Sequence, residues 1–221
     1  IFSIWPESSP IKLKNFFTYK TSSEDIEDFF NELYPGSNPV LFPSARSGLS
    51  AIISFLFSRQ SKVWVPPFSS HCVLNSVAYN ATPTTEFLPN LDGTIIFHQW
   101  GYTHNPIKSG IIIEDSVDTL ITPGGNIFPC DGRFELLSLP KIFGTIFGGI
   151  VFCQTQTDAE KLKKIRQERK LLKWKHVIDR IRAKSSETCS LRWNSCEPMN
   201  GFLPSVICQN IIEQASNIDK L

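Results

Sequence analysis

The chain has 221 residues, of which 41% are hydrophobic, 12% aromatic and 19% charged, with a formal net charge of +1. These values exclude a disordered chain, and the balanced charge gives no general attraction to nucleic acid or to a membrane surface. No apolar run reaches the ~18 residues of a membrane-spanning helix, and no signal peptide is visible.

The six cysteines do not have the spacing of a zinc site. None forms a C-x-x-C pair, and none clusters with histidines at metal-ligand spacing. We therefore expect free thiols, a reducing cytoplasm and no metal site.

The N-terminal part begins with an irregular, aromatic stretch over residues 1–20, which we interpret as an arm lying on another surface, such as a partner subunit. Thr21–Glu24 resembles a capping box, and a helix follows it. Val40–Pro43 then leads through the small residues 44–48 into a largely buried helix over Leu49–Phe57. Such a helix start can bind an anion with its free N–H groups, although a serine that only caps the helix explains the same residues.

The middle of the chain alternates short apolar runs with a further helix. We expect strands over Lys62–Val65, Thr84–Leu88 and Thr94–Phe97, and a helix over Cys72–Asn80. This alternation indicates an α/β fold. His98 follows the third strand and either touches a cofactor or only satisfies a backbone carbonyl. Neither a GxGxxG nor a GxxxxGK[ST] motif is present, which disfavours a dinucleotide site and a P-loop.

The stretch from residue 111 to residue 153 carries the strongest chemical signal. Its first strand, ending at Ile113, delivers Glu114 and Asp115 at the carboxyl edge, where open α/β sheets bind ligands. A second apolar run ends at the single lysine Lys141, and a third strand follows over Gly149–Cys153. Such an acid and lysine could serve pyridoxal phosphate, the lysine as Schiff base and the carboxylate at the pyridine nitrogen. On these two residues alone, a loop-capping acid and a surface lysine are the favoured explanation, because such residues are common at strand ends and in loops.

The C-terminal part is predicted to begin with one long helix over Asp158–Lys184. Its excess of positive charge is better explained by a solvated face than by nucleic acid, because no nucleic-acid motif accompanies it. We divide the chain into the arm (1–20), a large domain (21–184), and a loop and helix (185–221). The last segment leads toward a small C-terminal domain that we expect to be absent or truncated.

Five motifs follow one another in a fixed order between about residues 40 and 153. They are Ser44-Ala-Arg-Ser-Gly-Leu49, Val63-Trp-Val-Pro-Pro-Phe68 with Asn75-Ser-Val77, His98-Gln-Trp-Gly101, Ile113-Glu-Asp115-Ser-Val-Asp118, and Lys141 followed by Gly148-Gly149-Ile-Val. Together they resemble the DegT/DnrJ/EryC1/StrS family of sugar aminotransferases, which are fold type I pyridoxal phosphate enzymes. The fold we expect is α/β, with a three-layer α/β/α large domain built on a mixed, mostly parallel sheet.

The resemblance implies roles for individual residues. Lys141 would be the Schiff-base lysine and proton shuttle, and Asp115 would be the partner of the pyridine nitrogen. The turn formed by Ala45, Arg46 and Ser47 would hold the cofactor phosphate through its backbone and side chains.

Further positions are implied less directly by the same resemblance. Asp118 stands where the family has a glutamine near the cofactor hydroxyl, and Ser138 is a candidate for the phosphate. The aromatic residue that stacks on the cofactor ring is open, because Ser70 falls on the expected position. His71 and Phe68 are the candidates.

The function implied is a pyridoxal phosphate-dependent aminotransferase that acts on a nucleotide-linked keto-sugar with an amino-acid donor such as glutamate. The family forms its active sites at a dimer interface, so the resemblance implies a homodimer, with no nucleic acid or membrane partner. A non-catalytic pseudoenzyme that keeps the fold for binding or assembly is the alternative, since the phosphate turn lacks its usual glycine. Sugar dehydration is a third possibility, but some relatives use histidine for it, and Lys141 argues against it.

Overall fold

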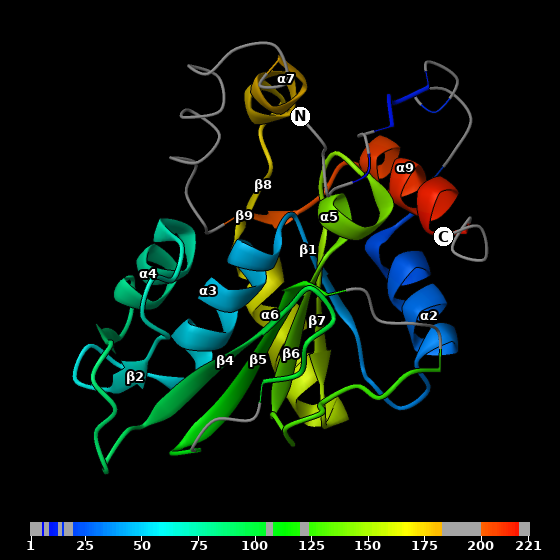
Figure 1. Ribbon diagram of the computed structural model, residues 1–221. Coiled ribbons are helices and arrows are strands. Elements are labelled where there is room, and N and C mark those ends of the chain that lie inside the picture. Colours follow the sequence, from blue (N-terminus) through cyan, green and yellow to red (C-terminus); the bar gives the residue numbers. More distant parts are fainter. Residues whose placement is uncertain are drawn as a thin grey trace.

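The computed structural model describes residues 6, 9–12, 15, 20–104, 108–119, 124–182 and 200–216, in which helices and strands alternate (Figure 1). The helices are α2 (Ser23–Leu33), α3 (Ala45–Leu56), α4 (His71–Ala78), α5 (Leu139–Phe143), α6 (Gln156–Glu168), α7 (Trp174–Arg182) and α9 (Ser205–Ala215). The strands are β1 (Val40–Phe42), β2 (Lys62–Trp64), β3 (Thr82–Thr84), β4 (Gly93–Gln99), β5 (Ile111–Asp118), β6 (Phe134–Ser138), β7 (Gly149–Cys153), β8 (Lys170–Leu171) and β9 (Asn200–Phe202).

Within the described ranges, seven strands form one sheet in the order β1-β7-β6-β5-β4-β2-β3. The pairs from β3 through β2, β4 and β5 to β6 are parallel, whereas β7 runs antiparallel to both β6 and β1. Strands of this kind are buried on both faces, which explains why their sequences are continuous apolar runs. The mixed, mostly parallel sheet predicted from the sequence is confirmed.

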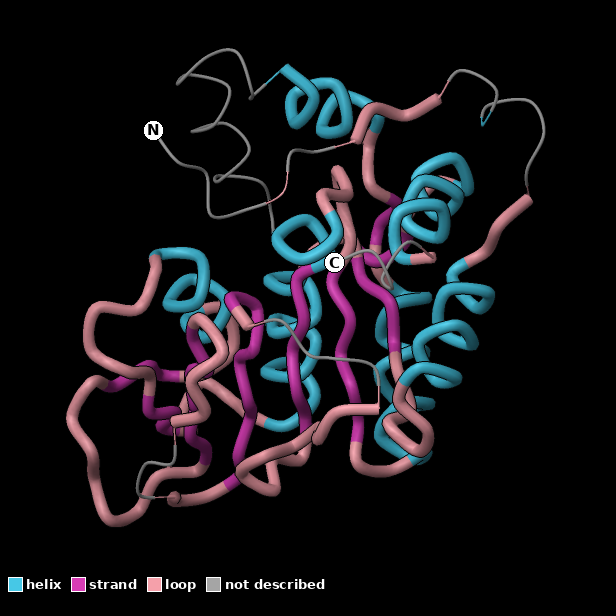
Figure 2. The backbone as a smooth tube through the Cα atoms, turned by 45° about the vertical axis from the view of Figure 1, so that its right-hand side comes forward, coloured by secondary structure: helices cyan, strands magenta, loops and turns pink. Residues whose placement is uncertain are grey.

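Helices cover both faces of the sheet and give three layers (Figure 2). Successive residues of a strand point to opposite faces, so β6 and β7 each feed two hydrophobic cores. Leu136 and Val151 pack in the core that contains α3, α4 and α6. Leu137 and Ile150 pack in the other core, with α2, α5 and α9. The predicted α/β/α arrangement is therefore confirmed.

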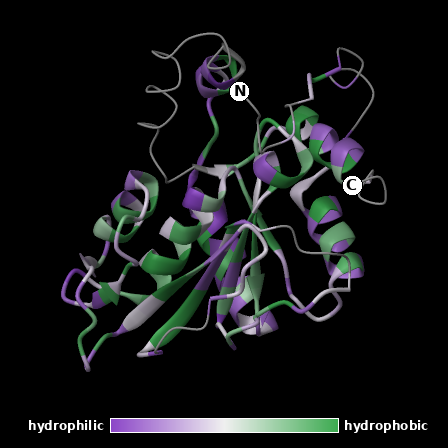
Figure 3. Ribbon diagram, in the orientation of Figure 1, coloured by the Kyte–Doolittle hydropathy of each residue, from purple (hydrophilic) through white to green (hydrophobic). Residues whose placement is uncertain are grey.

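The prediction of one long helix over 158–184 is wrong. The chain leaves the helical conformation after Glu168 and forms β8, which pairs in parallel with β9 from a distant part of the chain. Gly201 allows this approach, because a Cβ on it would lie only 2.3 Å from the carbonyl oxygen of Arg166. Helical periodicity carries no information about this tertiary pairing. The separate helix α7, at the top of Figure 3, mixes hydrophilic and hydrophobic residues.

Two strands also differ from their predicted bounds. The strand predicted over 84–88 is instead β3, which ends at Thr84, because the Thr84 hydroxyl accepts a hydrogen bond from the Glu86 N–H at 3.2 Å and turns the chain. β5 continues past Ile113 to Asp118, since β4 extends beside it as far as Gln99. Both Glu114 and Asp115 consequently lie within a strand and not beyond its end.

A buried ion pair ties the layers together. Arg166 of α6 and Glu27 of α2 form this pair, with 1% and 3% of their side chains exposed. Glu27 also accepts the Leu41 N–H at 2.9 Å and pairs with Lys163 at 2.9 Å. One carboxylate thus fastens two helices to the edge strand β1.

No helix among the described residues has both the length and the apolar character needed to span a bilayer. The predicted arm lies largely outside these residues, and the polar loop predicted over 185–198 lies wholly outside them. The division of the chain into arm, large domain and C-terminal segment therefore stays a prediction.

Candidate active site

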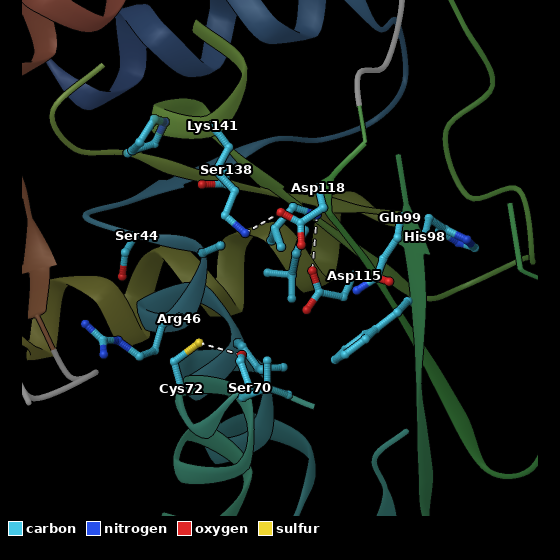
Figure 4. Close-up of a pocket in the computed structure, with 18 of the residues that line it drawn as sticks. Ser44, Arg46, Ser70, Cys72, His98, Gln99, Asp115, Asp118, Ser138 and Lys141 are labelled. Carbon is cyan, nitrogen blue, oxygen red and sulfur yellow. Dashed lines mark hydrogen bonds and ion pairs between the residues drawn. The ribbon is translucent and has the colours of Figure 1, made fainter. Parts of the chain in front are cut away.

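A cavity of about 740 Å³ opens at the carboxyl ends of β4, β5 and β6, beside the start of α3 (Figure 4). Its volume is in the ordinary range for small-molecule sites, and its position is the usual ligand edge of an open α/β sheet. Six of the eight candidate site residues line it, namely Ala45, Arg46, Asp115, Asp118, Ser138 and Lys141. The other two, Ser47 and His71, are not among the residues that line it.

The start of α3 forms one wall of the cavity. Ser44 caps this helix, because its hydroxyl accepts the Ser47 N–H at 3.1 Å. The Ser47 hydroxyl lies 3.0 Å from that of Ser44 and is buried, which explains why Ser47 does not reach the cavity. Ala45 and Arg46 occupy the first turn, where helical N–H groups have no partner within the helix. This wall can therefore accept an anion.

Close packing against β7 fixes the position of this helix start. Gly148 donates its N–H to the Pro43 carbonyl at 2.9 Å. At Gly149, a Cβ would lie 2.1 Å from the backbone nitrogen of Ala45, so a side chain cannot be accommodated there. The Gly148-Gly149 pair recognised in the sequence thus has a physical purpose, since it lets the strand approach the anion-binding turn.

Strand β5 carries two acids into the cavity. Asp115 is only 5% exposed, and burial raises its pKa from 3.8 to about 6. The Val117 N–H, which donates to its carboxylate at 3.2 Å, and the charge of Lys141 oppose this rise, whereas the charge of Asp118 adds to it. Above about pH 6 the Asp115 carboxyl is therefore an anion held in an apolar setting, ready to pair with a positively charged group.

The short helix α5 presents the lysine. Pro140 lies in its first turn, and Gly144 ends it in the left-handed conformation at φ +65°. Lys141, in its last turn, extends into the cavity and forms an ion pair with Asp118 (Figure 4). Ser138 caps the same helix without a side-chain hydrogen bond to it and lines the cavity. The structure thus brings the lysine and the two acids together.

The neighbouring acid, Glu114, faces the opposite side of β5 and is fully buried. It accepts hydrogen bonds from the Cys130 N–H at 3.0 Å and the Gly132 N–H at 2.6 Å. His98 lies with its Nε2 2.7 Å from the same carboxylate, and its Nδ1 accepts the His104 N–H at 3.1 Å. The ring is therefore the Nε2–H tautomer.

The sequence left two alternatives for His98, contact with a cofactor or a hydrogen bond to a backbone carbonyl, and the network matches neither completely. The histidine lines the cavity, but both of its nitrogens are used within the protein, and its partner is a carboxylate and not a carbonyl. His98, Glu114 and Cys130 lie close enough together to hold a metal ion. Their hydrogen bonds already account for the arrangement, since the Cys130 thiol donates to the His104 carbonyl at 3.1 Å. The network anchors the strand that carries Asp115.

Sequence reasoning missed several polar residues of this cavity, among them Ser44 and Arg180. Ser44 could have been found, because it is the N-cap of the helix whose turn was singled out. Arg180 of α7 also lines the cavity. Its burial lowers the pKa of its guanidinium, and the nearby charge of Arg46 lowers that pKa further. No sequence signal distinguishes Arg180 from the other cations of the basic segment.

The ring-stacking residue stays open. Phe68 lines the mouth of the cavity with its side chain fully exposed and its backbone at φ +66°. His71, the other candidate, is exposed on the first turn of α4. Phe97, the neighbour of Asp115 on the adjacent strand, also lines the cavity and was not predicted.

The chemistry of this cavity fits pyridoxal phosphate. The cofactor requires an amine for its aldehyde, a carboxylate for its pyridine nitrogen and an anion site for its phosphate. Lys141, Asp115 and the start of α3 offer these three groups within one cavity. Glycine at 149 keeps the strand close to the start of α3 and so fixes the position of this wall of the cavity.

Comparisons with known proteins agree with this chemistry. A family model described as "Putative PLP-dependent aminotransferase" matches residues 26–221. No match was found among curated protein sequences.

Solved structures show the same fold. Helicobacter pylori PseC, an aminotransferase involved in the biosynthesis of pseudoaminic acid, is 16% identical with a TM-score of 0.68, and the match covers 100% of this chain and 66% of PseC. An aminotransferase from Psychrobacter cryohalolentis is 14% identical with a TM-score of 0.67, covering 100% and 65%. The 8-amino-7-oxononanoate synthase of Francisella tularensis is 16% identical with a TM-score of 0.60, covering 94% and 62%. The chain thus spans about two thirds or less of the length of these three structures.

Proposed function

The chain belongs to a family of pyridoxal phosphate-dependent aminotransferases, and from this we propose that it transfers an amino group from an amino acid such as glutamate to a nucleotide-linked keto-sugar. The observation that carries the proposal is the placement of Lys141 and Asp115 in one cavity beside the start of α3. The likeness to PseC, an aminotransferase of pseudoaminic acid biosynthesis, supports a sugar as the acceptor. A homodimer, which the family resemblance implies, and a cytoplasmic location, which the cysteine spacing suggested, belong to the same proposal.

The residues have distinct roles in this account. Pyridoxal phosphate, when bound, supplies an aldehyde that accepts amines and a ring that withdraws electrons. The first turn of α3, with the Arg46 guanidinium, would hold the phosphate through N–H groups and positive charge. Lys141 would hold the cofactor by its Nζ and, once displaced by the donor, would move a proton as a general base.

Asp115 would keep the pyridine nitrogen protonated. Its carboxyl has a pKa of about 6, so it is mainly ionised at neutral pH and can pair with a cationic ring nitrogen. Burial strengthens that pairing, because few water molecules screen a side chain that is 5% exposed. A cationic ring nitrogen beside Asp115 would offset the cost of burying this charge.

A spectroscopic experiment tests the proposal. The purified protein is incubated with pyridoxal phosphate and passed through a desalting column, and its absorbance is recorded near the edge of the visible range. We expect a retained band for the natural chain, no band for Lys141→Ala, and an unchanged band for Lys108→Ala. Lys108 is a suitable control, because its side chain is 37% exposed against 36% for Lys141.

Addition of glutamate then separates the alternatives. If the chain is an aminotransferase, glutamate removes the band and a nucleotide-linked keto-sugar restores it, with release of the amino-sugar. A chain that retains no cofactor would be the non-catalytic binding protein considered above. A band that glutamate leaves unchanged would contradict amino transfer from this donor.

A further inference from the structure

The ion pair between Lys141 and Asp118 is a feature that the proposed function does not require. The lysine comes from α5 and the acid from the last residue of β5, and both side chains line the cavity (Figure 4). Their side chains are 36% and 21% exposed, so both groups can be reached by a small molecule that enters the cavity.

A carboxylate in this position affects what the lysine can do. An amine attacks a carbonyl carbon with its lone pair, which is available only after the ammonium group has lost a proton. The Asp118 carboxylate holds the lysine nitrogen in one place through a charge-assisted hydrogen bond, which the nitrogen must leave before it can react. An amide in the same place would accept a hydrogen bond without the full negative charge.

We propose that Asp118 is a positioning residue that restrains Lys141, holding its ammonium group in the cavity and limiting its reaction with an incoming aldehyde. The charge of Asp115 on β5 also interacts with that of the lysine, but Asp115 is deeper and nearly inaccessible. His98 on β4 uses both of its ring nitrogens within the protein. Asp118 thus offers Lys141 a carboxylate that is accessible from the cavity.

The inference goes beyond the proposed function, because it concerns the reactivity of Lys141 toward aldehydes in general. It can therefore be tested without pyridoxal phosphate. The probe is formaldehyde with a mild hydride donor, which methylates lysine amines: the nitrogen adds to the aldehyde carbon, water leaves, and hydride reduces the product. Mass spectrometry of peptides gives the rate at each lysine.

The chain provides an internal reference. Lys163 has a side chain that is 34% exposed and pairs with Glu27 at 2.9 Å, so it matches Lys141 in exposure and in having an acidic partner. In Asp118→Asn and Asp118→Gln we expect the rate at Lys141, divided by that at Lys163, to rise about 1.5- to 5-fold, the range for a partly exposed ion pair. Asp118→Glu, which keeps the charge, should leave the ratio close to that of the natural chain.

One result would contradict the restraint of Lys141 by Asp118. An unchanged or lower ratio in both neutral variants would overturn the proposal. A variant that unfolds would expose both lysines and bring their rate ratio close to that of free amines. Thermal melting would reveal such unfolding, and the second neutral variant then decides. Failure to bind pyridoxal phosphate would count against the proposed function but not against this restraint, since the probe reports on the amine alone.

Discussion

Asp115→Asn should make the cofactor-free protein more stable at neutral pH. Burial raises the pKa of this carboxyl from 3.8 to about 6, so the folded protein resists its ionisation more than the unfolded chain does. Because a tenfold change in an ionisation constant corresponds to about 1.4 kcal/mol, the difference costs about 3 kcal/mol once the group is ionised in both states. The nearly complete burial of Asp115 means that solvent screening reduces this figure little.

The dependence on pH follows from the direction of the change. Between about pH 4 and pH 6 the folded protein binds a proton at Asp115 that the unfolded chain has released, so the contribution of this group to stability decreases as the pH rises. The amide of the variant has no such titration. The free energy of unfolding of Asp115→Asn, minus that of the natural chain, should therefore increase by about 2.5 kcal/mol from pH 4 to pH 7.5.

Urea denaturation across this pH range, on protein freed of cofactor, measures the difference directly. Asp158→Asn is the matched control, because its carboxylate is 4% exposed and accepts two hydrogen bonds at 2.8 Å from Arg133. The Arg133 guanidinium holds the pKa of Asp158 below its usual value, so that variant should lose stability most at neutral pH. A flat difference for Asp115→Asn, or one with the slope of the control, would refute the reasoning.

Two further predictions concern other parts of the framework. Ser44→Ala and Ser22→Ala each remove a helix N-cap and should each cost about 1 kcal/mol in urea denaturation, but only the Ser44 variant should weaken retention of pyridoxal phosphate in equilibrium dialysis. Equal retention of pyridoxal phosphate by the two variants would mean that the start of α3 does not bind the phosphate. Arg166→Leu should cost about 3–5 kcal/mol by leaving Glu27 buried without its main partner, and adding Glu27→Leu should recover part of the loss; a double variant no more stable than the single one would contradict this.

The parts of the fold that are predictable from the sequence are those fixed by local patterns. Apolar runs buried on both faces predict the central strands, and the turn before α3 predicts a helix start, because each pattern has a direct physical cause. From the sequence, Asp115 of β5 and Lys141 of α5 could be assigned to one site only through the order of several motifs. Six of the proposed site residues accordingly line one cavity.

The parts that could not be predicted depend on contacts between distant segments. The basic segment forms two helices because β8 pairs with β9, and periodicity within the segment does not show this pairing. Ser47 does not line the cavity, because it is buried beside Ser44, whose hydroxyl lies 3.0 Å from its own. Arg180 reaches the cavity only because α7 follows that break in the helix.

The most direct test of the account is to identify the lysine that holds pyridoxal phosphate. The protein is incubated with the cofactor, the linkage is reduced with borohydride, and the peptides are sequenced by mass spectrometry. The account predicts the added mass on Lys141 and on no other lysine at equimolar cofactor. Cofactor attached to a different lysine, or attached to none, would contradict it.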